Sequence, residues 1–244
     1  MLEQYKIHNT SFLNPSVEYS DSSMNKSFQQ DLEKFKDSIM SNIHNEESLT
    51  YYKFGDGDYY FLKKEKRGSA KPGIRALKKP YFMINHRKFV TGSKKNDVYM
   101  SLSTKMHKAM FLETFSKHAD FASEYVYGLL ANKWLLQASR GKVGIIGADK
   151  KLELINLLME KDQYQNYLGI DKFHDYIDIP QRFACDNLNK TIKHVEKQLN
   201  NSTSKIFLVG IGHVKSGLLH ELKKIKKAIY IDVGVGIDAL AGIV

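Results

Sequence analysis

The sequence contains one cysteine, four prolines and no apolar run long enough to span a membrane. Because Cys185 is alone, an intramolecular disulfide and a multi-cysteine zinc site are excluded, and a reducing compartment is favoured. The scarcity of proline excludes long proline-rich linkers. Residues 1–14 are polar and lack the apolar core of a secretory signal. We therefore expect a cytoplasmic protein without a membrane span.

Acidic residues are also fewer than basic residues. Lysine and arginine total 37 against 27 acids, which gives a formal net charge of +10. This balance favours an anionic partner, such as nucleic acid, an anionic membrane surface or a phosphorylated small molecule. A basic surface that serves solubility alone is the simpler alternative. With 42% hydrophobic and 26% charged residues over 244 positions, the chain has the composition and length of a globular domain.

The distribution of apolar residues divides the first half of the chain into a polar lead-in and a series of predicted helices and strands. Residues 1–24 are polar and predict a loosely ordered lead-in, and residues 25–244 predict one domain. Apolar residues then recur every three or four positions between Phe28 and Ile43, which is typical of an amphipathic helix. Residues 50–54 and 97–102 predict strands, and the pattern from 105 to 137 is mostly helical.

The last hundred residues alternate between short apolar runs and helical patterns. Strands are predicted at 142–147, 175–179, 205–210 and 228–232, and helices at 150–161, 188–199 and 216–226. This order predicts an α/β fold with a mostly parallel central sheet and helices on both faces, in the manner of a Rossmann-like nucleotide-binding domain. The apolar end at 239–244 predicts that the chain is a fragment of a longer polypeptide.

Polar residues whose side chains could take part in binding or catalysis follow the predicted strands. Asp56 and Asp58 follow the first strand, and His213 follows the strand at 205–210. Asp232 closes the last strand, and Asp238 lies a few residues further on. Ligands of open α/β sheets bind beyond the carboxyl ends of the strands. We therefore expect these side chains to gather along one edge.

The densest signal is Gly55-Asp56-Gly57-Asp58. Two carboxylates on a tight, glycine-rich turn suit Mg²⁺ or Mn²⁺, which prefers oxygen ligands and bridges phosphate oxygens. Asp-Gly pairs also occur in ordinary hairpin turns, so a plain turn is the alternative.

Two further segments have the composition of phosphate-binding loops. Ser69, Lys71 and Arg75 lie in a basic loop with small residues, although the Walker A order is missing. Gly212 and His213 lie at a strand-to-helix turn, where helix amides attract phosphate. His213 is a candidate metal ligand, phosphate contact or base, and a structural hydrogen-bonding role is the alternative.

The chain resembles the D-type (GT-D) glycosyltransferases in the string YKFGDGD, residues 52–58. The longer strings FGDGDYYFL, GSAKPGIRALKKPY, IGAD, FACDNL, VGIGHVKSGLLHEL and IYIDVGVGIDALAG resemble the N-terminal glycosyltransferase domain of a multidomain chlorovirus protein. The similarity runs from about Thr50 to the end. In the GT-D motif the second acid is glutamate, whereas this chain has Asp58.

The resemblance implies a transferase that uses a UDP-sugar donor, with Mn²⁺ or Mg²⁺, to build glycans on an acceptor, in host cytoplasm if the chain is viral. The viral domain implies rhamnose as the transferred sugar, and glucose is the other candidate. Asp56 and Asp58 would bind the diphosphate and the metal, with His213 as a further ligand. We expect Lys71 and Arg75 to stabilise the leaving diphosphate, and Asp232 or Asp238 to deprotonate the acceptor.

Two alternative functions would require different ligands. A Rossmann-like methyltransferase would use the turn at residues 145–149 to bind S-adenosylmethionine, but its usual glycine-rich loop is missing. A nucleic-acid-binding module would use the net charge of +10, but no RRM, KH or helix-turn-helix pattern is present. We therefore expect no nucleic-acid partner.

Overall fold

The computed structural model describes residues 22–64, 85–126, 136, 142–180 and 184–243. Its strands are β1 (Thr50–Phe54), β2 (Val98–Ser101), β3 (Phe121–Ala122), β4 (Val143–Ala148), β5 (Asp175–Ile179), β6 (Ile206–Gly210) and β7 (Ile229–Asp232). Its helices are α2 (Ser22–His44), α3 (Asp56–Lys63), α5 (His86–Ser93), α6 (Lys105–Phe115), α9 (Asp149–Met159), α10 (Asp162–Leu168), α11 (Leu188–Leu199), α12 (Lys215–Ile225) and α13 (Gly236–Leu240), and a short 3₁₀ turn spans Gly212–Val214.

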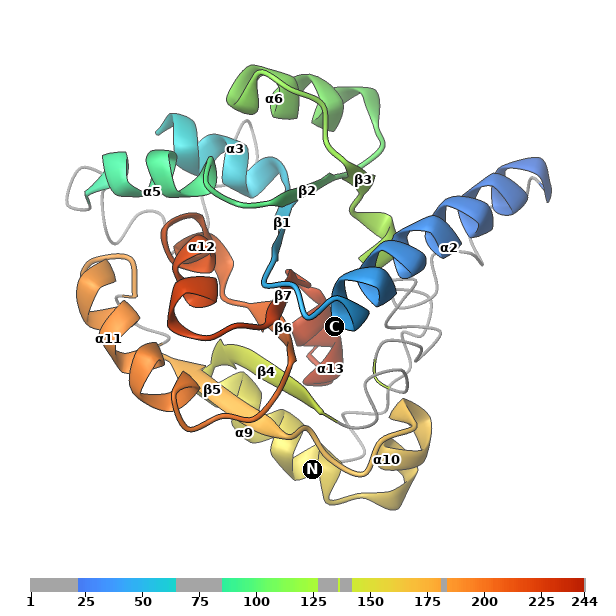
Figure 1. Ribbon diagram of the computed structural model, residues 1–244. Helices are drawn as coiled ribbons and strands as arrows, with labels where there is room; N and C mark the ends of the chain where they lie inside the picture. Colours follow the sequence, from blue (N-terminus) through green and yellow to red (C-terminus); the bar gives the residue numbers. More distant parts are fainter. Residues whose placement is uncertain (1–21, 65–84, 127–135, 137–141, 181–183, 244) are drawn as a thin grey trace.

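The seven strands form one sheet in the order β3-β2-β1-β7-β6-β4-β5, and every neighbouring pair is parallel. The expectation of an α/β fold with a parallel central sheet is confirmed (Figure 1). Parallel strands are buried on both faces, which explains why runs such as IFLVG and VGIIGA are almost continuously apolar. The expected boundary between a lead-in at 1–24 and a domain from 25 stays a prediction, because residues 1–21 lie outside the described part.

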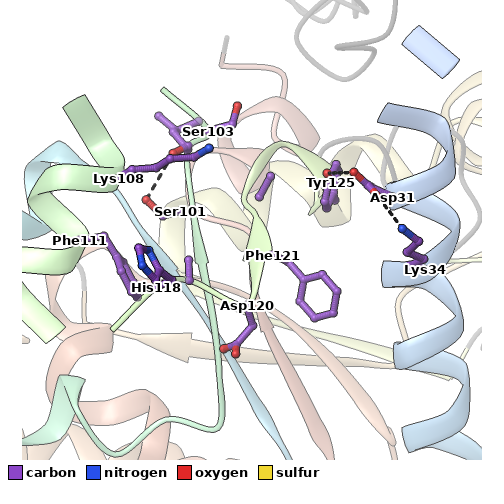
Figure 2. Close-up of a pocket in the computed structure, with 13 residues that line it drawn as sticks. Asp31, Lys34, Ser101, Ser103, Lys108, Phe111, His118, Asp120, Phe121 and Tyr125 are labelled. Carbon is purple, nitrogen blue, oxygen red and sulfur yellow. Dashed lines mark hydrogen bonds and ion pairs between the residues drawn. The ribbon is translucent and has the colours of Figure 1, made fainter. Parts of the chain in front are cut away.

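The segment expected to be mostly helical from 105 to 137 is partly wrong. Helix α6 ends at Phe115, where Ser116 adopts the left-handed conformation (φ 55°), and β3 follows as an edge strand. In Figure 2, Phe121 of β3 points toward α2, and its ring lies 4.8 Å from that of Phe35 on this helix. This aromatic contact anchors a two-residue strand whose sequence carries no alternating pattern.

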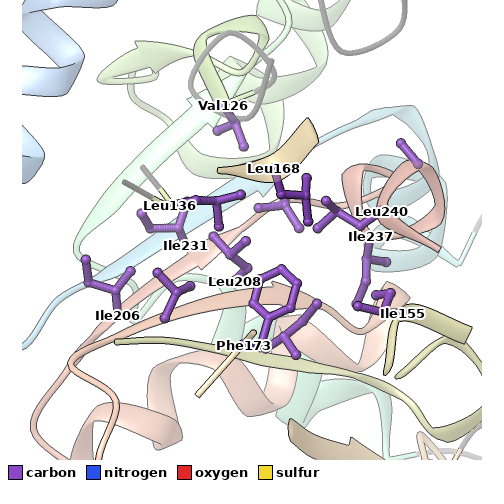
Figure 3. Close-up of a cluster of buried hydrophobic side chains, with 14 of the residues drawn as sticks. Val126, Leu136, Ile155, Leu168, Phe173, Ile206, Leu208, Ile231, Ile237 and Leu240 are labelled. Atoms are coloured by element: carbon purple, nitrogen blue, oxygen red, sulfur yellow. The ribbon is translucent and has the colours of Figure 1, made fainter. Parts of the chain in front are cut away.

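Helices cover both faces of the sheet, as expected. Residues of α2, α9, α10 and α13 pack on one face, where the buried cluster includes Ile155, Leu208 and Ile231 (Figure 3). Residues of α3, α5, α6, α11 and α12 pack on the other. Adjacent residues Tyr51 and Tyr52 of β1 belong to opposite clusters because side chains alternate along a strand. No helix within the described ranges is both long and apolar enough to cross a bilayer.

Candidate active site at the ends of β1, β7 and β6

Two strand-to-helix turns meet at the carboxyl edge of the sheet. Strand β7 pairs with β1 on one side and with β6 on the other, so the β1–α3 and β6–α12 turns flank its end. The amino termini of α3 and α12 therefore lie close together. Residues more than 150 positions apart in the sequence share this place, and the contacts described next join them.

The Asp-Gly-Asp segment forms the first turn of α3 rather than a hairpin turn. Gly55 is the N-cap residue in extended conformation (φ −136°), and its N–H donates to Asp58 Oδ2 at 2.9 Å. Asp56 Oδ1 accepts from the N–H of Gly57 at 2.8 Å. Carboxylates in the first turn satisfy free amides and favour the helix dipole. Asp58 thus has a structural role in addition to any chemistry.

Asp58, Lys215 and Asp232 form a buried carboxylate–lysine cluster. Lys215 Nζ lies 3.0 Å from Asp58 Oδ2 and 2.7 Å from Asp232 Oδ2, and it also donates to the carbonyl of Lys53. All three charged side chains are at most 7% exposed. The cluster ties β1, α3, α12 and β7 together at one point.

The Lys215 ammonium and the carboxylates around it shift the pKa values of Asp58 and Lys215 in opposite directions. Burial by itself would raise the pKa of Asp58, but the Lys215 ammonium and the His213 contact outweigh it and lower the pKa to about 2. Burial by itself would lower the pKa of Lys215, but the Asp232 and Asp58 carboxylates raise it well above its usual value. Asp58 and Lys215 are therefore charged at neutral pH.

His213 is the titratable side chain of this group that reaches solvent. Its ring stacks on Phe61 of α3, with centroids 4.7 Å apart and planes within 5° of parallel. His213 Nδ1 lies 3.8 Å from Asp58 Oδ1, and the imidazole is 43% exposed. The preceding Gly212 has a positive φ of 58° and faces open space, so a ligand can approach the backbone there.

The two aspartates expected to act as base are placed apart. Asp232 is fully buried, and its oxygens accept from Lys215, from the N–H of Lys53 at 3.1 Å and from the N–H of Gly234 at 2.9 Å. Asp238 lies on α13 and pairs with Lys151 of α9. The catalytic roles of both stay predictions. The geometry argues against Asp232, because a buried, saturated carboxylate cannot meet an acceptor hydroxyl, whereas the Asp238 side chain is 20% exposed and is paired with Lys151.

Of the expected metal ligands, Asp58 and His213 lie 3.8 Å apart, but the Asp58 carboxylate has other partners. Asp58 Oδ2 is already held by Lys215 and by the Gly55 amide, so an ammonium lies where a cation would bind. Among the described residues, no three His, Cys, Asp or Glu side chains are placed to hold a metal ion. The requirement for Mn²⁺ or Mg²⁺ stays a prediction. Ser69, Lys71 and Arg75 of the basic loop lie outside the described residues.

Lys215 is the site residue that sequence reasoning missed. It is the first residue of α12, where the helix dipole disfavours a cation. A lysine at the first position of a helix is unfavourable unless carboxylates lie beside it. Lys215, which follows the glycine-rich end of β6, could therefore have indicated a carboxylate cluster at this place. Its neighbour Ser216 is also buried and shares a hydrogen bond of 2.8 Å with the hydroxyl of Tyr52.

Comparisons with known proteins give one remote likeness. No protein-family model matches the chain, and no curated protein matches it, so the resemblance to a chlorovirus domain gains no support. Among solved structures, the chain is similar to one described as "A New Glycosyltransferase (DUF1792) from Streptococcus sanguinis". The two share 14% identity at a TM-score of 0.46, over 84% of this chain and 79% of that one. A likeness at this level assigns no activity, which has to be argued from the site.

Proposed function

We propose that the chain is a glycosyltransferase that moves a sugar from a UDP-linked donor to a glycan acceptor. The observation that carries this proposal is the meeting of two helix amino termini, α3 and α12, beside the exposed imidazole of His213. The open backbone at Gly212 leaves room for a ligand at the same place. The sequence resemblance to GT-D transferases covers the β1–α3 turn, residues 52–58, and supports the same reaction class.

The donor's leaving group would be stabilised by the backbone around Gly212 and by the dipoles of α3 and α12, because the Gly55 and Gly57 amides of α3 already donate to Asp58 and Asp56. A departing diphosphate gains negative charge, and amides at helix amino termini together with the helix dipole favour that charge. Lys215 fixes the spacing of the two helix ends because it holds Asp58 on α3 from its own position at the start of α12. Preorganisation of this kind avoids the reorganisation cost that water would impose during the reaction.

His213 is our candidate for proton transfer, in place of Asp232 or Asp238. The acceptor hydroxyl attacks the anomeric carbon, the bond from this carbon to the diphosphate oxygen breaks with its electron pair, and the hydroxyl proton passes to the imidazole. The products are a glycoside and UDP. Asp58 Oδ1, 3.8 Å from His213 Nδ1, stabilises the imidazolium that forms. Asp58 and Phe61 would then act as positioning residues.

The experiment is a UDP-release assay with the full chain and a panel of UDP-sugars that begins with rhamnose and glucose. Each donor is tested with and without glycan acceptors, and each arm is repeated with Mn²⁺, with Mg²⁺ and with EDTA. Acceptor-dependent release of UDP supports the proposal, and the metal arms decide the metal prediction separately. Binding of S-adenosylmethionine without binding of any UDP compound would overturn the proposal in favour of a methyltransferase.

A further inference from the structure

A second feature of the carboxyl edge lies one strand away from the Asp58 turn. A cavity of about 630 Å³ opens where β2 ends and β3 begins (Figure 2). Its walls come from α2, from the end of β2, from α6, and from the segment around β3. A volume of this size is ordinary for a small-molecule site. None of the residues assigned above to proton transfer or to the carboxylate–lysine cluster lines it.

The strand order links this cavity to the proposed diphosphate site. Strands β1, β2 and β3 are successive neighbours, and Ser101 at the end of β2 is the register partner of Phe54, which directly precedes Gly55. In doubly wound sheets the phosphates lie at the turn after the first strand, and the nucleoside extends over the end of the next strand. A donor whose diphosphate lies at α3 would therefore extend its nucleoside into this cavity.

The side chains that line the cavity differ between its two sides, in the order expected for a phosphate, a ribose and a base with increasing distance from β1. Ser101, Ser103 and Lys108 lie on the side nearer β1, where hydroxyls and a cation suit a ribose and the adjoining phosphate. Phe121 and Tyr125 lie on the side of α2, farther from β1, and both are partly exposed. Aromatic rings are the surfaces on which bases stack. The Asp31–Lys34 ion pair lies beside Tyr125 at the same end, and the Ser103 hydroxyl donates to Glu124 at 2.7 Å. A cation and hydroxyls near the phosphate end, with aromatic rings and polar partners for a base edge beyond them, match the order of groups in a nucleoside diphosphate.

We propose that this cavity is the nucleoside subsite of the donor, taking the ribose toward Ser101 and the base toward Phe121. The inference rests on the proposed function, since it assumes a nucleotide-linked donor whose diphosphate binds at α3 and α12. The rival occupant is the glycan acceptor, because sugars also stack on aromatic rings. A test therefore has to separate binding of the nucleoside from binding of the diphosphate and from binding of the acceptor.

The test measures the Kd of UDP and of inorganic pyrophosphate by calorimetry in the full chain and three variants. Ala119→Trp fills the cavity, and Lys108→Ala removes the exposed cation on its β1 side without touching the core, while Lys34 on the α2 side stays in place. The control is Ala109→Trp, the same change at an exposed position of α6 that does not line the cavity. Thermal unfolding of each variant checks that the fold is retained.

Filling the cavity should raise the Kd of UDP by roughly tenfold or more, since a lost stacking site is worth that much. Lys108→Ala should raise it by a few-fold, about the value of one exposed charge contact. Ala119→Trp should leave the pyrophosphate Kd at its wild-type value. Lys108→Ala should raise the pyrophosphate Kd by no more than the same few-fold, because Lys108 lies on the phosphate side of the cavity, and the control should change neither Kd.

Unchanged UDP binding in a folded Ala119→Trp variant, or in Lys108→Ala if the first does not fold, would overturn the nucleoside subsite while leaving the proposed function intact. A rise confined to the acceptor KM would assign the cavity to the acceptor instead. If wild type binds neither UDP nor pyrophosphate, the proposed function itself fails.

Discussion

Lys215 Nζ on α12 lies 3.0 Å from Asp58 Oδ2 on α3, with both side chains almost fully buried. The two residues are 157 positions apart in the sequence, and strand β7 lies between the strands that lead to them. This contact holds the glycine-rich turn after β6 against the Asp-Gly-Asp turn after β1. The proposed site therefore depends on an ion pair that belongs to the core rather than to the surface.

Removing the ammonium should be costly. Lys215→Met keeps the length of the side chain but leaves Asp58 and Asp232 buried without their cation. Breaking a buried ion pair by removing one partner costs about 3–5 kcal/mol. The free energy of unfolding, measured by urea denaturation, should fall by this amount. Lys224→Met is the control, because Lys224 pairs with Glu221 on the surface and such pairs contribute less than about 1 kcal/mol. Equal losses in the two variants would contradict the prediction.

The same cluster should make the free energy of unfolding depend on pH in the acid range. The pKa of Asp58 is about 2 in the folded chain against a usual 3.8, so the unfolded chain binds more protons between these values. The contribution of Asp58 to stability is present above about pH 4 and is lost as the pH falls toward 2, in total roughly 2 kcal/mol. Urea denaturation across this range should show a shallower acid dependence in Asp58→Asn than in wild type. Identical pH profiles would show that Asp58 is not held ionised by Lys215.

The sheet could be predicted from the sequence where burial on both faces leaves a continuous apolar run. Strands β4 to β7 and helices α9, α11 and α12 were predicted within a residue or two. Helix α5, with the sequence HRKFVTGS, has no such signal and was missed. Its Phe89 packs in the buried core and Gly92 lets it approach α12 closely, and these contacts depend on tertiary placement and not on local pattern.

The site was predictable to the extent that it follows strand ends. Asp58, His213 and Asp232 were expected at one edge, and they do lie together. Asp238 also follows a strand end, that of β7, but it pairs with Lys151 in the first turn of α9, on the face of the sheet opposite α3 and α12. Which strand ends become neighbours depends on the strand order β1-β7-β6, and the sequence reveals the strands without this order.

The close approach of α5 and α12 predicts the sign of the stability change when Gly92 is replaced by alanine. Helix propensity alone predicts that Gly92→Ala stabilises α5 by about 0.5–1 kcal/mol. A Cβ at Gly92, however, would lie 2.5 Å from the carbonyl oxygen of Ser216. We therefore expect a loss of about 1–3 kcal/mol in urea denaturation, as for other overpacked positions. Gly55→Ala is the control for the clash, because its added Cβ meets nothing nearer than 3.9 Å and its φ is ordinary, so its loss should be limited to the roughly 0.5–1 kcal/mol that alanine costs at an N-cap. A stabilised Gly92→Ala variant would mean that the two helices can separate at little cost.

His213→Gln separates chemistry from structure. The imidazole is 43% exposed and touches Asp58 and Phe61, so its loss should change stability little, while kcat for sugar transfer should fall by about 10²–10⁴-fold, the usual contribution of proton transfer. His194→Gln is a matched control, since His194 also pairs with an aspartate, Asp178 at 2.9 Å, and is 42% exposed, but lies on α11 away from the site. Its kcat should stay at the wild-type value. If His213→Gln raised only KM, the imidazole would be a binding contact for the donor, and the proton would have to leave through another group.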